Sequence, residues 1–271
     1  MLTNVQVQTL GDDLLELTLE DVQLGYILTN IEGLDPVKAQ VVSTDFAQLD
    51  GVQYQSSYLG NRDIKFTIEL EPFDYTISVS ELRSQLYKFF LPKTPVTLTF
   101  NDTIRRTVYI KGVVEEFSTE IFSKVPTVNV AVFCADPDFK ELLESTVTGV
   151  SGSLSYPFTY TGNVPTGSVL TILCSADNNG LTVYHGATGT PTYTFQLDHP
   201  FRTNDIITIS SEAGNKYVTL TRNGVTSSIV YTITTGAIWP KALPGTNNIQ
   251  VQQTTPGSSF NMVWTARHGG L

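Results

Sequence analysis

Short runs in which apolar and polar residues alternate recur along this chain, and they limit its fold more than any other feature. The runs at 15–19 (Leu-Glu-Leu-Thr-Leu), 64–70 and 128–132 all follow this pattern. In a β-strand, such alternation places the apolar side chains on one face and leaves the other face wet. Turn-forming pairs such as Asp50-Gly51 separate the runs. The sequence therefore predicts a mainly β protein made of antiparallel sheets.

One segment departs from this pattern and carries the signals of a helix. Ser78 with Glu81 three residues later forms a capping box, and Pro92 ends the run. Between them the apolar residues recur at helical spacing: Val79, Leu82, Leu86, Phe89 and Phe90. This apolar stripe predicts one helix that packs on a sheet of the core.

A change of composition divides the chain into two domains. The 271 residues are enough for two cores, and Ser, Thr and Gly dominate the start of the segment 146–168, where charge vanishes. We therefore expect a first domain at 1–145, a linker leading into a strand at 146–168, and a second domain at 169–271. Short strands with regular turn signals, one of them at 229–232, predict a β-sandwich of jelly-roll type for the second domain.

The stretch 31–62 organises the first domain. Turn-forming residues and one arginine mark it: Gly33, Asp50, Gly51, Gly60 and Arg62. We expect a strand, a long exposed loop from Pro36 to Asp50, a hairpin tip and a second strand. A long hairpin is also expected from Arg105 to Phe133.

Charge is distributed unevenly between the two halves. Residues 1–150 hold 22 acidic and 11 basic residues, a net charge of −11, whereas residues 151–271 hold 4 and 5, a net charge of +1. Ordinary nucleic-acid binding needs clustered basic side chains that neutralise phosphates. The acidic first half therefore argues against a nucleic-acid-binding protein.

Residues capable of catalysis or metal binding do not cluster along the sequence. His185, His199 and His268 are far apart, and none has a carboxylate or cysteine at metal-ligand spacing. The adjacent carboxylates Glu115 and Glu116 should point to opposite faces of a strand, which does not suit a pair of catalytic acids. We predict no catalytic residue, no metal ligand and no cofactor, and hence a protein that is not an enzyme.

The remaining composition indicates a protein made in the cytosol. No apolar run approaches the roughly 20 residues that span a bilayer, and residues 1–8 lack the features of a signal peptide. Cys134 and Cys174 are expected to be buried thiols. Trp239 and Trp264 are expected to be core or edge aromatics and not part of a sugar site.

Several landmarks resemble the distal tail protein (Dit) of siphophages, a phage tail component family. The first domain carries Ile-Glu-Gly-Leu-Asp-Pro at 31–36 and Leu-Gly-Asn-Arg-Asp-Ile at 59–64, and it closes on Cys-Ala-Asp-Pro at 134–137. The second half resembles the galectin-like domain of that family through an ordered series of elements: 195–197, 203–209, 216–220, Leu-Pro-Gly-Thr-Asn at 243–247 and Arg-His-Gly-Gly-Leu at 267–271.

This resemblance implies a fold and a structural role. The fold is mainly β: an N-terminal sandwich or barrel-like ring-forming domain with one helix and a long hairpin, then a galectin-like jelly-roll sandwich. The implied role is a virion protein of the baseplate hub at the tail tip, assembled in the host cytoplasm. Its homohexameric ring would join the tail tube protein to the tail-tip hub (tail-associated) protein and let DNA pass without specific binding. Receptor-binding proteins are possible further partners, and no membrane insertion is implied.

A channel for DNA should carry like charge, which repels phosphates within a Debye length of about 8 Å. The candidates for such a lining are acidic residues of the first domain: Glu16, Glu20, Glu115 and Glu116. Two other functions stay open at this stage. The second domain could be a carbohydrate-binding or host-adhesion module, or the chain could be a tail tube protein that polymerises into long tubes.

Overall fold

The computed structural model describes residues 2–11, 13–18, 25–46, 50–72, 77–102, 107–120, 123, 125–188 and 192–271. Two compact units are present: unit 1 comprises Met1–Leu142 with Gly269–Leu271, and unit 2 comprises Leu143–His268. The segment 146–168 lies in unit 2, where it contains the end of one strand and two further strands. Unit 2 therefore starts before residue 169, where the second domain is expected to start. It also ends before residue 271, because residues 269–271 pack in unit 1.

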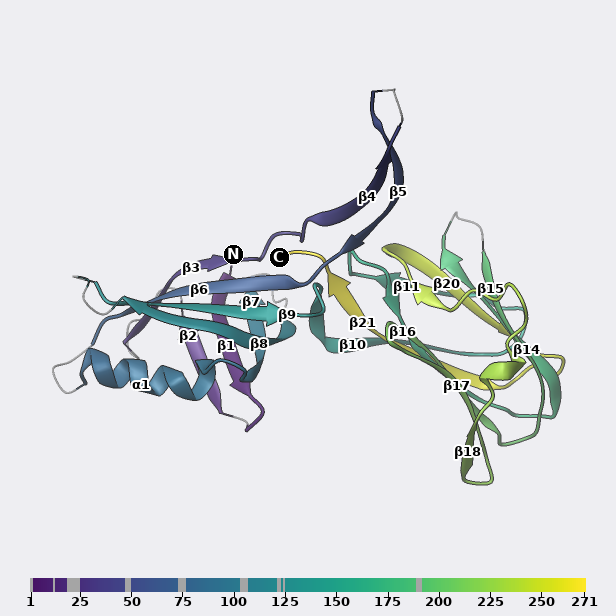
Figure 1. Ribbon diagram of the computed structural model, residues 1–271. Helices are drawn as coiled ribbons and strands as arrows, with labels where there is room; N and C mark the ends of the chain where they lie inside the picture. The colour runs from purple at the N-terminus through teal and green to yellow at the C-terminus, as the bar shows by residue number, and fades with distance from the viewer. Residues whose placement is uncertain are drawn as a thin grey trace. The chain divides into compact units, whose positions relative to one another are not determined.

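Unit 1 is a curved antiparallel sheet with one α-helix among its described residues (Figure 1). Its elements are β1 (Leu2–Thr9), β2 (Leu14–Thr18), β3 (Tyr26–Glu32), β4 (Ala39–Asp45), β5 (Val52–Leu59), β6 (Arg62–Leu70), α1 (Val79–Phe90), β7 (Pro95–Asp102), β8 (Thr107–Glu120), β9 (Thr127–Cys134) and β10 (Phe139–Val150), which continues into unit 2. The main sheet has the order β2-β1-β7-β8-β9-β6-β3.

The curvature comes from β8, which changes partner along its length. Residues 107–113 of this strand pair with β7, and residues 113–120 pair with β9. The ladder is interrupted between Val114 and Glu116 by a β-bulge, a device that bends a strand and increases its twist. The sheet therefore folds over its own apolar face, as a barrel does, and encloses the core of unit 1.

Helix α1 packs against this core and confirms the predicted helix. Its N-cap, Ser78, accepts a hydrogen bond through its hydroxyl oxygen from the Glu81 backbone N–H at 3.2 Å. Three of its apolar side chains are buried: Leu82, Leu86 and Phe90. At 12 residues, α1 is too short to cross a bilayer, and no other helix among the described residues is long and apolar enough to do so.

The expected loop from Pro36 to Asp50 is one strand of a hairpin. β4 and β5 pair only with each other, from Ala39↔Leu59 to Asp45↔Val52, and every side chain on both strands is exposed. Gly51 has φ = 102° and follows Asp50 near the turn, as the turn signal predicts. The sequence suggested a loop here because the alternation of apolar and polar residues that marks a half-buried strand is missing from 39–45.

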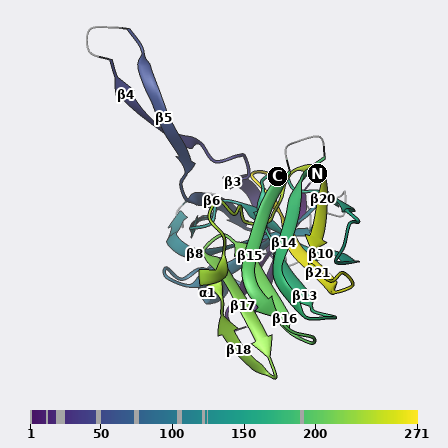
Figure 2. The same cartoon turned by 90° about the vertical axis from the view of Figure 1, so that its right-hand side faces the viewer.

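Unit 2 is a β-sandwich. Its strands are β11 (Tyr156–Tyr160), β12 (Thr166–Gly167), β13 (Val169–Leu173), β14 (Asn178–Ala187), β15 (Tyr193–Phe201), β16 (Ile206–Glu212), β17 (Asn215–Arg222), β18 (Val225–Ser228), β19 (Lys241–Ala242), β20 (Gly245–Gln252) and β21 (Ser259–His268). One layer has the order β18-β17-β16-β13-β21, and the other has the order β11-β20-β14-β15, which faces the viewer in Figure 2. Apolar side chains from both layers fill the core between them.

One strand expected in unit 2 is absent. Residues Val230–Thr232 form a single 3-10 turn, η1, and not part of a strand at 229–232. The Thr232 backbone N–H and hydroxyl both donate to the Ile229 carbonyl oxygen, at 3.0 and 2.7 Å. Because β-branched residues are common in strands, this stretch has a strand-like composition, but local hydrogen bonds determine its structure.

Candidate functional site

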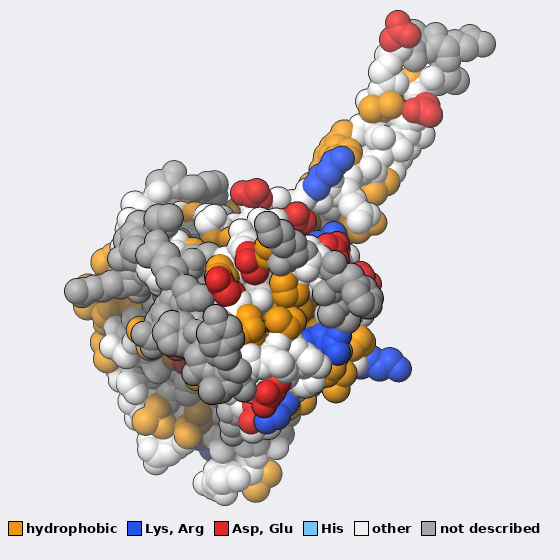
Figure 3. Space-filling view, turned by 90° about the vertical axis from the view of Figure 1, so that its left-hand side faces the viewer, with side chains coloured by type: hydrophobic (Ala, Val, Ile, Leu, Met, Phe, Trp, Pro, Cys, Tyr) orange, Lys and Arg blue, Asp and Glu red, His pale blue; other side chains and the backbone are white. Residues whose placement is uncertain are grey.

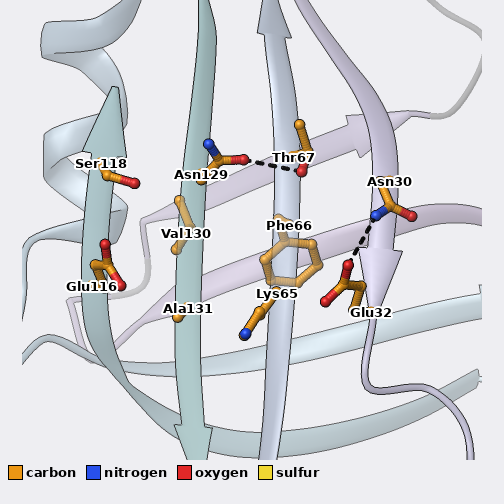
Figure 4. Close-up of a pocket in the computed structure, with 10 residues that line it drawn as sticks. All are labelled: Asn30, Glu32, Lys65, Phe66, Thr67, Glu116, Ser118, Asn129, Val130 and Ala131. Atoms are coloured by element: carbon orange, nitrogen blue, oxygen red, sulfur yellow. Dashed lines mark hydrogen bonds between the residues drawn. The ribbon is translucent and has the colours of Figure 1, made fainter. Parts of the chain in front are cut away.

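The outward face of β3, β6, β9 and β8 carries a polar depression of about 290 Å³ (Figure 4). Two rows of side chains cross the four strands in register. One row is Glu32, Lys65, Ala131 and Glu116, and the other is Asn30, Thr67, Asn129 and Ser118. We call these eight residues the charged face. Apolar residues of the same strands, such as Ile64, Ile68 and Val132, point into the core.

Two β-bulges keep polar residues on the charged face. In β3 the register shifts between Leu28 and Asn30, and in β8 it shifts between Val114 and Glu116. Strict alternation would send one of two adjacent residues into the core, whereas the bulge leaves both Glu115 and Glu116 exposed. Regular alternation, which the sequence predicts, would instead place the two carboxylates on opposite faces.

Hydrogen bonds order the row that contains Asn30, Thr67, Asn129 and Ser118. The Thr67 hydroxyl donates to Asn129 Oδ1 at 3.0 Å, and Asn30 Nδ2 donates to Glu32 Oε1 at 3.4 Å (Figure 4). The ammonium-bearing side chain of Lys65 stands in the row between those of Glu32 and Glu116. Two carboxylates and one ammonium give this row a net charge of −1. Its chemistry is that of an exposed, weakly anionic surface, without a nucleophile beside a base.

The predicted lining residues do not all come together. Glu116 lies on the charged face, and Glu115 is the extra residue of the adjacent bulge. Glu16 lies at the other end of the sheet order on β2, where it accepts a hydrogen bond from Asn4 Nδ2. Glu20 lies outside the described residues. Glu32 and Lys65 also line the charged face but are not among the predicted lining residues. The period-two pattern of β6 is the signal that could have placed Lys65 on the solvent-exposed face.

Arg62, predicted as part of the turn signature, is a buried anchor with an exposed fraction of 2%. Its guanidinium donates to four backbone carbonyl oxygens, those of Gly33, Asp35 (2.7 Å), Pro137 (2.6 Å) and Gly269 (2.6 Å). It also lies over the ring of Phe139, 4.4 Å from the ring centroid. Burial lowers the pKa of Arg62, while the nearby Asp138 opposes that shift. Arg62 therefore holds together the β3–β4 connection, the β9–β10 connection and residues 269–271.

The glycines of the signature serve this anchor and the hairpin. At Gly33, φ is 90° and an added Cβ would lie 2.1 Å from the Asp63 carbonyl oxygen, so no other residue fits there. Gly60, with Asn61, connects β5 to the strand that starts at Arg62. Asp50 and Gly51 lie at the far end of the β4–β5 hairpin, on which apolar side chains are exposed (Figure 3).

The histidines and cysteines do not form a chemical site. Burial lowers the pKa of His185, whose Nε2 lies 3.0 Å from the Ile238 carbonyl oxygen. Burial raises the pKa of Cys134 to about 12 and also raises that of Cys174. Within the described ranges, no three His, Cys, Asp or Glu side chains lie close enough together to hold a metal ion.

Both tryptophans pack on the core of unit 2, as expected. Trp264 is 4% exposed and contacts Phe158, with ring centroids 4.6 Å apart. Trp239 contacts Phe195 at 5.0 Å and lies beneath the Lys216 ammonium. Neither ring is therefore free to form the platform of a sugar site.

Two family models match the chain in sequence order. Residues 13–134 match the phage tail protein RIFT-related domain, and residues 161–268 match the siphovirus-type tail component, C-terminal domain. Together the two matches span most of both units. No curated protein matches the chain by sequence.

Solved structures share the fold. The Dit protein of phage SPP1, described as a paradigm of the hub adsorption apparatus in phages that infect Gram-positive bacteria, superposes with a TM-score of 0.66 at 16% identity. That match covers 97% of this chain and 98% of the other. A chain of the phage p2 baseplate in its activated conformation matches over the same shares with a TM-score of 0.43 and 11% identity. The likeness to SPP1 Dit extends over both units, and the mainly β fold predicted from the sequence is confirmed.

Proposed function

The chain belongs to the siphophage distal tail (Dit) family, a family of structural tail and baseplate proteins, and from this premise we propose that it closes the tail tube as a homohexameric ring. One phage tail family model covers residues 13–134 and another covers residues 161–268, and this observation carries the proposal. In the ring, unit 1 surrounds a passage for DNA and contacts the tail tube protein on one side and the tail-tip hub protein on the other. This role requires no catalysis.

The β4–β5 hairpin is the proposed contact between neighbouring copies. Its exposed apolar residues include Val41 (62%), Val52 (56%), Tyr54 (61%) and Tyr58 (57%). A two-stranded hairpin alone in water is marginally stable, and both outer edges of this one are unpaired among the residues that the structure describes. Seating on the next copy would bury this surface. The contact is heterologous, because the hairpin of one copy meets a different surface of the next, and such contacts can close into a ring.

The hairpin from Arg105 to Phe133, also expected as a contact element, is less suited to this role. Its two strands, β8 and β9, pair with each other and with β7 and β6 within unit 1. Both strands are therefore built into the main sheet of unit 1, unlike β4 and β5. We assign the neighbouring-copy contact to β4–β5 alone.

The charged face is the proposed channel lining. It is an exposed sheet surface with amides and hydroxyls in one row and a net negative row beside it. Such a surface offers DNA phosphates hydrogen-bond donors but no cluster of cations, so it does not hold the passing strand. This assignment retains Glu116 from the predicted lining, adds Glu32, and omits Glu16, which lies at the far end of the sheet order.

Charge reversal tests the lining. The double variant Glu32→Lys with Glu116→Lys should slow genome ejection from assembled virions by about tenfold at low salt, with less effect at high salt. The matched control, Glu144→Lys with Glu212→Lys, changes two exposed glutamates of unit 2 by the same total charge. Equal ejection rates for the two double variants would contradict the assignment.

Mass measurement tests the ring. Light scattering of the purified protein should give particles of six times 29.8 kDa. A tube-forming protein would give long polymers instead. A set of rings with another number of copies would disprove the hexamer while leaving family membership intact.

A further inference from the structure

The β4–β5 hairpin is joined to the rest of unit 1 by two short connections. Residues 33–38 lead into β4, and residues 60–61 lead from β5 to Arg62. Among the described residues the two strands pair only with each other, and the hairpin extends away from the sheet of unit 1 in Figure 1 and Figure 2. The direction of the hairpin therefore depends on what holds the two connections in place.

Residues 269–271 lie against the first of these connections, and we call these three residues the clasp (Figure 1). The Leu271 backbone N–H donates to the Leu34 carbonyl oxygen at 3.0 Å. Gly270 packs so closely on Pro36 that an added Cβ would lie 2.8 Å from Pro36 Cδ and 3.0 Å from the Pro36 nitrogen. A side chain at position 270 would therefore push the connection away from the clasp.

Arg62 joins the clasp to both connections. Its Nη2 donates to the Gly269 carbonyl oxygen at 2.6 Å. Its Nη1 donates to the carbonyl oxygens of Asp35, at 2.7 Å, and Gly33 in the first connection. Arg62 itself directly follows the second connection, residues 60–61. One buried guanidinium thus fixes the clasp and the two ends of the hairpin relative to one another.

The clasp adds little to the hydrophobic core of unit 1. Gly269 and Gly270 have no side chain, and Leu271 is 44% exposed. The fully buried apolar side chains of this core come from the β-strands and α1 instead. Loss of the clasp should therefore leave the core folded and change mainly the course of the connection at 33–38.

From these contacts we propose that the clasp sets the direction of the β4–β5 hairpin and thereby controls whether one copy can join the next. This inference rests on the proposed function, in which the hairpin is the contact between copies. A heterologous contact closes into a ring only if the rotation from copy to copy is right. A hairpin that turns about its connections would meet its neighbour at many angles and lose more conformational entropy on docking. The clasp removes this freedom before assembly.

Distances between two spin labels on the full chain test the direction of the hairpin. The labels are attached at Gln53→Cys on β5 and Lys88→Cys on α1, which are exposed positions. The native Cys134 and Cys174 are buried and should not react with the label. Dilution with excess unlabelled chain of the same variant limits the measurement to distances within one copy.

The distances are compared between chains with an intact clasp and chains with an altered one. All of them carry Tyr54→Ser with Tyr58→Ser, which removes the proposed contact, so that no neighbour holds the hairpin. The intact clasp should give a single narrow distance peak. Gly270→Ala and deletion of residues 269–271 should each replace that peak by a broad distribution. A narrow peak that is unchanged in both variants overturns the proposal.

A matched control separates the position of the added methyl group from its presence. Gly11→Ala adds a methyl group in the β1–β2 turn, where the nearest atom is Thr9 Oγ1 at 3.9 Å, and should keep the narrow peak. Both alanine variants should melt at the temperature of the parent. A broad distribution for Gly11→Ala as well, or a lower melting temperature for Gly270→Ala, overturns the assignment to the clasp.

Light scattering of the full chain without the tyrosine changes tests the control of assembly. Gly270→Ala should raise the concentration at which rings form by about tenfold, whereas Gly11→Ala should leave it unchanged. Equal assembly of both variants and the parent overturns the proposal. Single copies of the parent at every concentration would instead disprove the ring of the proposed function. The spin-label distances would then decide alone whether the clasp directs the hairpin.

Discussion

The two units hold an arginine in different ways, although both are β structures built on the same alternation. In unit 1 the Arg62 guanidinium is bound by carbonyl oxygens and one aromatic ring. In unit 2 Arg222 forms a bidentate pair with the buried carboxylate of Asp205, at 2.9 and 2.6 Å. The first arrangement fixes loops that are far apart in sequence, whereas the second neutralises a buried charge next to a turn. Arg62 therefore connects segments that are far apart in sequence, whereas Arg222 stabilises a local turn.

The outward faces of the two units differ in charge. The charged face of unit 1 carries carboxylates and one lysine, whereas the depression over β14, β15 and β20 of unit 2 has no charged lining residue. Inward residues in both units are mostly apolar and fill a core. The outward residues are where the two units diverge in function.

The largest expected effect comes from removing the anchor of unit 1. Arg62→Met should lower the free energy of unfolding by about 3–5 kcal/mol, because four carbonyl oxygens lose their donor. Arg62→Lys keeps the charge but cannot reach all four oxygens. Its free energy of unfolding should therefore lie between that of Arg62→Met and that of the parent. Urea unfolding measures both; a loss of less than 1 kcal/mol for Arg62→Met would show that the anchor matters little.

The local pair of unit 2 should matter less. Asp205→Asn is expected to cost about 2–3 kcal/mol, since the Arg202 N–H and the guanidinium lose a charged acceptor but keep a polar one. The Arg222 hydrogen bond holds the pKa of Asp205 below its ordinary value. This contribution is complete above the unfolded pKa and is lost as pH falls through the folded one, so the parent should lose it only in strong acid. An Asp205→Asn variant with unchanged acid sensitivity would contradict this account.

A smaller effect should follow from mild acid, and only in unit 2. Burial lowers the pKa of His185, so its neutral form stabilises the fold. Stability is complete above the unfolded pKa of about 6.5 and falls as pH drops from there toward the folded pKa. His185→Gln keeps a donor for the Ile238 carbonyl oxygen but does not titrate, and should flatten thermal stability between pH 7 and pH 5. Identical pH profiles for variant and parent would exclude His185 as the cause.

The smallest change in stability is expected at the hairpin. Tyr54→Ser with Tyr58→Ser should shift the free energy of unfolding by less than about 0.5 kcal/mol, because both rings are exposed. Particle mass should nevertheless drop from rings to single copies. Tyr231→Ser, which removes an exposed ring from unit 2, is the control and should leave the particle mass unchanged. Loss of stability without loss of assembly would reverse the proposed role of the hairpin.

The sequence predicts the regular parts of both units because burial imposes period two on strands and a 3.6-residue period on α1. It fails where backbone geometry departs from the period. The bulges before Asn30 and Glu116 alter which side chains share a face, and no residue type signals them. The sequence predicts the hairpin tip at Asp50-Gly51 but a loop where β4 lies, since a strand without a buried face shows no alternation.

At Arg62 the sequence predicts the position but not the contacts that explain it. Its place in the turn signature could be seen from the sequence, but its partners could not, because they lie as far away as Gly269. Lining residues were hardest to predict. Acidic residues are abundant in the first half, and only the register of four strands brings Glu32 and Glu116 onto one surface.

The return of residues 269–271 to unit 1 sets an order of events during translation. The ribosome makes these residues after all of unit 2, and only then can Arg62 reach the Gly269 carbonyl and Leu34 accept the Leu271 N–H at 3.0 Å. A nascent chain therefore lacks part of its first folded unit until the second has emerged.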